Sequence, residues 1–115
     1  MLDGTKQKTI REFFGYEAQM GKYGKLDEEM VELIQARSIY TDNPTQETLK
    51  HLLNELGDAL NVAEGEYVYN GGCLHEIASE KELKLYRCIK IINQIPEDTK
   101  QEDRVKEYDR IRREK

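Results

Sequence analysis

The apolar residues of this chain recur every three or four positions, the spacing of helices that bury one face. No segment alternates apolar and polar residues with the β-branched enrichment of a strand. The two prolines and two glycine clusters interrupt the pattern and divide the chain into helical segments. The sequence therefore predicts an all-α protein without a sheet.

The breaks in the pattern predict where the helices lie. We expect a short helix at about 5–14, three long helices at about 17–40, 44–69 and 75–94, and a charged helical segment at 101–115. The second long segment, at 44–69, has the clearest start, because Asn43 suits the N-cap and Pro44 the first helical position. We expect a helical domain of residues 1–97 and a charged C-terminal tail of residues 98–115.

Three long helices joined by short loops are typical of an antiparallel bundle. Three helices leave a wide apolar flank exposed, and such flanks mark interaction surfaces. We therefore expect an antiparallel helical bundle that is completed by oligomerisation, as a homodimer or a homotetramer.

Charge and composition exclude several classes of protein. The net charge of -5 argues against nucleic-acid binding, which needs a basic surface. No stretch approaches the roughly 20 apolar residues that span a bilayer, so no membrane association is expected. The N-terminal residues do not resemble a secretory signal, and the expected location is cytoplasmic. Cys73 and Cys88 are expected to be reduced thiols.

Two acidic motifs stand out: Glu28-Glu29-x-x-Glu32 in the helix expected at 17–40, and Glu55-x-x-Asp58 in the helix expected at 44–69. Glutamate accounts for 16 of the 115 residues, and charge runs on helices are usually solvated faces. Neither motif is therefore specific by itself, and the position of the acids around each helix distinguishes a solvated face from a binding site.

Helical geometry places most of these acids beside apolar stripes. At about 100° per residue, the expected stripe of the first of these helices consists of Tyr23, Leu26, Met30, Leu33 and Ile34. Glu29 and Glu32 border that stripe, whereas Glu28 points nearly opposite. Glu55 and Asp58 flank the stripe of the next helix, which consists of Leu49, Leu52, Leu53, Leu56, Leu60, Ala63 and Tyr67.

Residues three apart on a helix have Cβ atoms about 5–6 Å apart, so each pair can place two carboxylates on one ion. If the two flanks face each other, four carboxylates meet at the margin of the core, and their repulsion calls for a cation. Oxygen ligands match Mg²⁺, with Mn²⁺ as a possible substitute. We therefore predict a metal site made of Glu29, Glu32, Glu55 and Asp58.

The helix expected at 75–94 carries Lys84 and Arg87. Their angular offsets from Leu85 are the same as those of Glu55 and Asp58 from Leu56. They are either two basic residues on a solvated flank or a pair that holds phosphate oxygens. The residues alone leave both interpretations open.

Together, these motifs resemble the MazG-like, all-α nucleoside triphosphate pyrophosphohydrolases. The matching segments are Lys25–Ala36, which carries E-E-x-x-E, and Glu55–Leu60, which carries E-x-x-D. Lys84–Arg87 is similar to the K-x-x-R element of the family, and Phe14–Gln19 to the lead-in of its short, phage-type members. The resemblance covers most of the chain, from about Phe14 to Arg87.

The resemblance implies Mg²⁺-dependent hydrolysis of a (deoxy)nucleoside triphosphate to the monophosphate and pyrophosphate. The residues implied as metal ligands are Glu29, Glu32, Glu55 and Asp58. Glu28 completes the first motif, and Glu28 or Glu32 is the expected general base. The residues implied to bind substrate are Lys84 and Arg87 for phosphate, Gln19 and Asn61 for base or sugar, and Phe14, Tyr16, Tyr23 or another subunit for stacking.

Two alternatives stay open. Phosphoribosyl-ATP pyrophosphohydrolase is a related enzyme that shares the acidic helices. A helical homo-oligomeric regulatory or interaction protein would keep the fold and the acids without turnover. Release of pyrophosphate from a nucleotide panel separates this second alternative from an enzyme.

Overall fold

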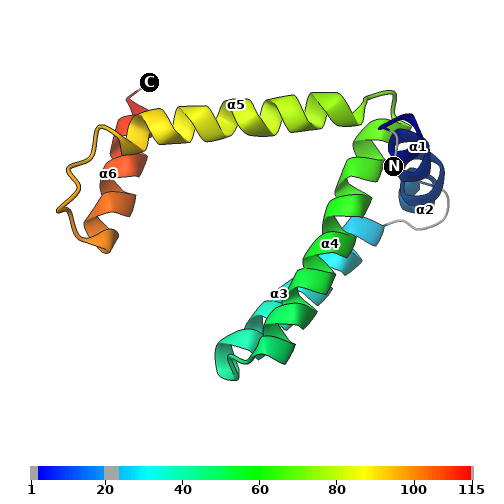
Figure 1. Ribbon diagram of the computed structural model, residues 1–115, viewed down its shortest axis with the longest axis horizontal. Coiled ribbons are helices and arrows are strands. Elements are labelled where there is room, and N and C mark those ends of the chain that lie inside the picture. The colour runs from blue at the N-terminus through cyan, green and yellow to red at the C-terminus, as the bar shows by residue number, and fades with distance from the viewer. Residues whose placement is uncertain (1–2, 20–23, 115) are drawn as a thin grey trace. The chain divides into compact units, whose positions relative to one another are not determined.

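The computed structural model describes residues 3–19 and 24–114, and every regular element within them is a helix (Figure 1). The elements are α1 (Asp3–Thr9), the π-helix η1 (Ile10–Gly15), α2 (Tyr16–Gln19), α3 (Lys25–Asp42), α4 (Gln46–Tyr69), α5 (Leu74–Ile92) and α6 (Gln101–Arg113). The predicted all-α class is confirmed. None of the described helices is long and apolar enough to cross a membrane.

The chain divides into two compact units, Met1–Leu74 and His75–Lys115. In the first unit, α3 and α4 form an antiparallel hairpin, and η1 and α2 pack against α4 (Figure 1). In the second unit, Ile91 of α5 packs with Ile95 and Ile111. The domain boundary expected after residue 97 falls inside the second unit. This boundary and the bundle of three long helices both stay predictions.

The start of α4 differs from the sequence prediction, because Thr45 caps the helix instead of Asn43. The Thr48 backbone N–H donates to Thr45 Oγ1 at 3.1 Å, and the Thr45 N–H donates to Thr48 Oγ1 at 3.0 Å. This reciprocal capping box satisfies two N–H groups at the helix start. Asn43 and Pro44 consequently lie in the turn that joins α3 to α4.

The helix expected at 17–40 is two helices in the structure, α2 and α3. Gly24 precedes α3 with a φ of 81°, a left-handed conformation that glycine adopts without steric cost. Gly21 and Tyr23, which the sequence placed in this helix, lie outside the described residues. The break expected between the helices at 5–14 and 17–40 is absent, since η1 leads directly into α2.

Two glycines allow η1 and α4 to touch through their backbones. A Cβ atom added to Gly15 would lie 2.6 Å from the Gly65 carbonyl oxygen, and one added to Gly65 would lie 2.7 Å from the Gly15 nitrogen. Real Cβ atoms essentially never come this close to backbone atoms. The crossing of η1 and α4 therefore requires glycine on both elements.

The packing faces of the hairpin differ from the stripes expected from the sequence. On α3, Ala36 and Glu29 are buried, whereas Met30 and Ile34 are exposed. The buried residues of α4 are Ala59, Val62, Gly65 and Val68. The members of its expected stripe that are exposed instead are Leu49, Leu53, Leu56, Leu60, Ala63 and Tyr67. Small side chains let helices approach closely. The buried faces of the hairpin carry Ala36 and Ala59, Gly65 of α4 meets η1, and the leucines lie outside.

Candidate metal centre

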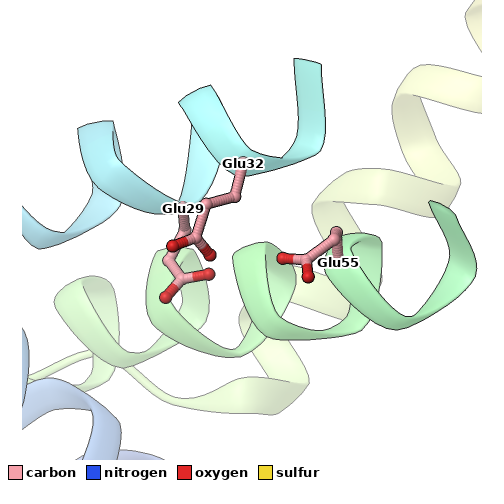
Figure 2. A group of neighbouring side chains, drawn as sticks. All are labelled: Glu29, Glu32 and Glu55. Atoms are coloured by element: carbon pink, nitrogen blue, oxygen red, sulfur yellow. The ribbon is translucent and has the colours of Figure 1, made fainter. Parts of the chain in front are cut away.

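Three glutamates converge across the α3–α4 hairpin. Glu29 and Glu32 extend from α3 toward Glu55 of α4 (Figure 2). Each residue offers one carboxylate oxygen, and these three oxygens lie within 4.8 Å of one another. Glu29 is buried, with an exposed fraction of 7%, Glu55 is half-buried, and Glu32 is exposed. The cluster thus extends from the helix interface to solvent.

Alanines on the acidic flanks bring these side chains together. Ala36 lies two turns after Glu29 on α3, and Ala59 lies about one turn after Glu55 on α4. Both alanines are buried, with exposed fractions of 0% and 4%. Because the contact faces of the two helices carry these small residues, the longer acidic side chains on the same faces meet.

The cluster contains more negative charge and more acceptor atoms than the described residues satisfy. Glu29 Oε2 and Glu55 Oε2 are both buried, and neither has a hydrogen-bond donor among residues 3–19 and 24–114. The negative charge of Glu29 raises the pKa of Glu32 above its ordinary value, and burial and the charge of Glu55 add to that effect. Buried carboxylate oxygens without a partner are costly, and a cation would relieve that cost. The oxygen-only donor set fits Mg²⁺ or Mn²⁺.

Lys25, at the start of α3, is a contact of this cluster that the sequence analysis did not single out. Its Nζ lies 3.0 Å from Glu29 Oε1 and 3.9 Å from Glu17 Oε1 of α2. The hydrogen bond to Glu29 raises the pKa of Lys25 above its ordinary value. The spacing of four residues between Lys25 and Glu29 was the available signal, because such residues are neighbours on a helix.

Two acids of the predicted site lie outside the cluster. Asp58, the fourth expected ligand, is exposed on α4, and its carboxylate is not among the oxygens that converge. Glu28 is also exposed and does not join them. Helical geometry explains both positions. At about 100° per residue, Asp58 points about 100° away from buried Ala59 on α4, and Glu28 points about 100° away from buried Glu29 on α3.

The residues expected to contact the base or sugar have varied exposure. Gln19 is exposed at the end of α2, and Asn61 is half-buried on α4. Phe14 is half-buried and stacks edge-on against Phe13, with ring centroids 5.0 Å apart. Tyr16 is exposed, and Tyr23 lies outside the described residues.

Lys84 and Arg87 belong to the second unit, where they border a basic groove of about 750 Å³ between α5 and α6. The basic groove is lined by Lys84, Arg87, Lys90, Ile91, Tyr108 and Arg112. Lys84 also lies 3.7 Å from Glu80, in an exposed ion pair. Lys90 and Arg112 are basic residues of this groove that the sequence analysis did not select, and Arg112 comes from the segment that was expected to be only a charged tail.

No known protein family, curated protein or solved structure matches this chain.

Proposed function

We propose that Glu29, Glu32 and Glu55 bind a divalent cation, Mg²⁺ or Mn²⁺. The observation that carries this proposal is the convergence of the three glutamates from two helices, with two buried oxygens that have no donor among the described residues. Carboxylates on a solvated helix face would separate instead of converging, because like charges repel. Their convergence supports a site built to share a cation.

We further propose that the chain hydrolyses (deoxy)nucleoside triphosphates to the monophosphate and pyrophosphate. A metal at the cluster, when bound, supplies charge neutralisation for the triphosphate. Water attacks the α-phosphorus, the bond from that phosphorus to the bridging oxygen breaks, and pyrophosphate leaves with that oxygen. A carboxylate accepts the proton from water. Glu32 suits this role better than Glu28, because Glu32 lies in the cluster and Glu28 does not.

The basic groove supports a role for Lys84 and Arg87 in holding phosphate. Four cationic side chains lie along one groove of a chain whose net charge is -5. Arginine binds phosphate oxygens through two parallel hydrogen bonds, and lysine contributes a compact charge. Gln19 and Asn61 are proposed as hydrogen-bonding partners of the base or sugar, as the family resemblance implies.

The test of this function is the release of pyrophosphate from a panel of ribo- and deoxyribonucleoside triphosphates with Mg²⁺. We expect metal-dependent release from at least one member, with the monophosphate as the second product in equal amount. Orthophosphate as the only product, or no turnover of any nucleotide, would refute the proposed reaction.

We also propose that the leucine-rich face of α4 mediates self-association. Its exposed residues are spaced alternately by four and three positions: Leu49, Leu53, Leu56, Leu60, Ala63 and Tyr67. That spacing is the heptad pattern of helices that pack against other helices. Association of two copies through this face would complete the helical bundle expected from the sequence. The same face favours a non-catalytic interaction protein, should the chain show no turnover.

Leu53→Glu is expected to convert the oligomer to a monomer. Leu53 is 66% exposed in the single chain, so glutamate costs little there, but it would bury an unpaired charge in an interface. Light scattering coupled to size-exclusion chromatography measures the mass. Asn54→Glu, an exposed position one residue away and outside the heptad pattern, is the control and should keep the wild-type mass. A monomeric wild-type protein would contradict the prediction.

A further inference from the structure

Lys25 contributes a positive charge at one edge of the acidic cluster. Its ammonium contacts Glu29 Oε1 at 3.0 Å, while Glu29 Oε2 is one of the two buried oxygens that no donor in the described part of the chain reaches. The lysine side chain is only 20% exposed, which shields the ion pair from solvent. The Glu29 carboxylate therefore contacts the Lys25 ammonium through Oε1, and its Oε2 is available to a metal cation.

The ammonium also joins two helices. Glu17 of α2 lies 3.9 Å from Lys25 Nζ, and Lys25 begins α3. The charges of Glu17, Glu29 and Glu28 all favour the protonated lysine. Lys25 therefore offsets part of the repulsion among the acids of the hairpin and fixes the orientation of the Glu29 carboxylate relative to α2.

We propose that Lys25 is an internal counter-ion that stabilises the acidic cluster and thereby limits how tightly the cluster holds a divalent metal. This inference rests on the proposed metal site and goes beyond it to the regulation of metal affinity. A fixed positive charge next to a ligand oxygen stabilises the carboxylate before metal arrives. The same charge repels a second cation once that cation binds nearby. Both effects weaken metal binding.

The test compares Lys25→Met, which keeps the length of the side chain and removes the charge, with Lys25→Arg, which keeps the charge. Titration calorimetry measures Mn²⁺ affinity, and urea unfolding in EDTA measures stability without metal. We expect Lys25→Met to lower the urea midpoint and to bind Mn²⁺ about tenfold more tightly, a change of about 1.4 kcal/mol. Lys25→Arg should stay close to wild type in both measurements.

Two further variants keep the outcome interpretable. Lys8→Met removes an equal charge from an exposed position on α1, and it should leave Mn²⁺ affinity unchanged. Lys25→Gln retains a hydrogen-bond donor for Glu29 without the charge, so it replaces Lys25→Met if that variant fails to fold. Tighter Mn²⁺ binding by Lys25→Gln than by wild type is then the expected result.

The results separate the inference from the proposed function. Mn²⁺ binding by wild type with equal or weaker binding by the neutral Lys25 variants overturns the counter-ion role alone. Absence of Mn²⁺ binding by wild type and by every variant overturns both the metal site and the counter-ion role. Equal tightening by Lys8→Met also overturns the inference, because net charge alone would then explain the effect.

Discussion

Glu29→Gln and Glu55→Gln are each expected to lower Mg²⁺-dependent pyrophosphate release by at least about 100-fold, a loss of about 2.7 kcal/mol in transition-state stabilisation. Each substitution replaces a carboxylate that holds a buried, unpartnered oxygen with a neutral amide of almost the same shape. The amide is a weak ligand for a hard divalent cation, which prefers charged oxygens. Initial rates over a range of Mg²⁺ concentrations measure the effect.

Folding must be separated from activity in this experiment. Glu55→Gln should retain the wild-type helix content and at least the wild-type stability in EDTA, because it removes one negative charge from a crowded cluster. Glu47→Gln, an exposed glutamate in the first turn of the same helix, is the matched control and should keep full activity. Normal turnover by folded Glu29→Gln and Glu55→Gln would refute the assignment of the site.

Gly65→Ala and Gly57→Ala are expected to change the stability of the protein in opposite directions, although both positions lie on α4. At Gly65 the added methyl group would lie 2.7 Å from the Gly15 nitrogen and 2.8 Å from the Phe14 carbonyl carbon. Neither backbone atom can move alone, so η1 and α4 must separate. We expect a loss of about 1–3 kcal/mol, the usual cost of overpacking.

At Gly57, apart from its chain neighbours and the nearby backbone of α4, no atom of the described residues lies within 4 Å of the added methyl group. Alanine is the better helix former, so this substitution should stabilise the protein by about 1 kcal/mol. Urea unfolding followed by circular dichroism compares the two variants with wild type. Similar effects of both substitutions would mean that the close crossing of η1 and α4 does not contribute to stability in solution.

Periodicity was sufficient to predict the helical class, because the 3.6-residue repeat is a local property of the chain. It predicted the faces of the helices less well. The rule that large apolar residues are buried favoured Met30, Ile34 and the leucines of α4, whereas the buried faces of the hairpin carry Ala36 and Ala59. Which face a helix buries depends on the shape of its neighbour, and that information is not local.

The candidate site, like the buried helix faces, was predicted only in part. Glu29, Glu32 and Glu55 were placed on facing flanks and are brought together in the structure. Asp58 is one-sixth of a turn too far around the helix to join them in this conformation, an offset that pairwise spacing does not resolve. Lys25 was not predicted to join the cluster, because the prediction rested on the repulsion among the acids and left out the lysine four residues before Glu29.

The alanines of the α3–α4 contact have a consequence for ion selectivity. The cluster draws ligands from both helices, so the distance between α3 and α4 sets the space available to an ion. Mg²⁺ is held at about 2.1 Å from its ligands and Ca²⁺ at about 2.3–2.6 Å. If the cluster binds metal as proposed, the methyl groups of Ala36 and Ala59 act as spacers that favour the smaller ion. The preference for a metal would then be determined partly by residues that never touch it.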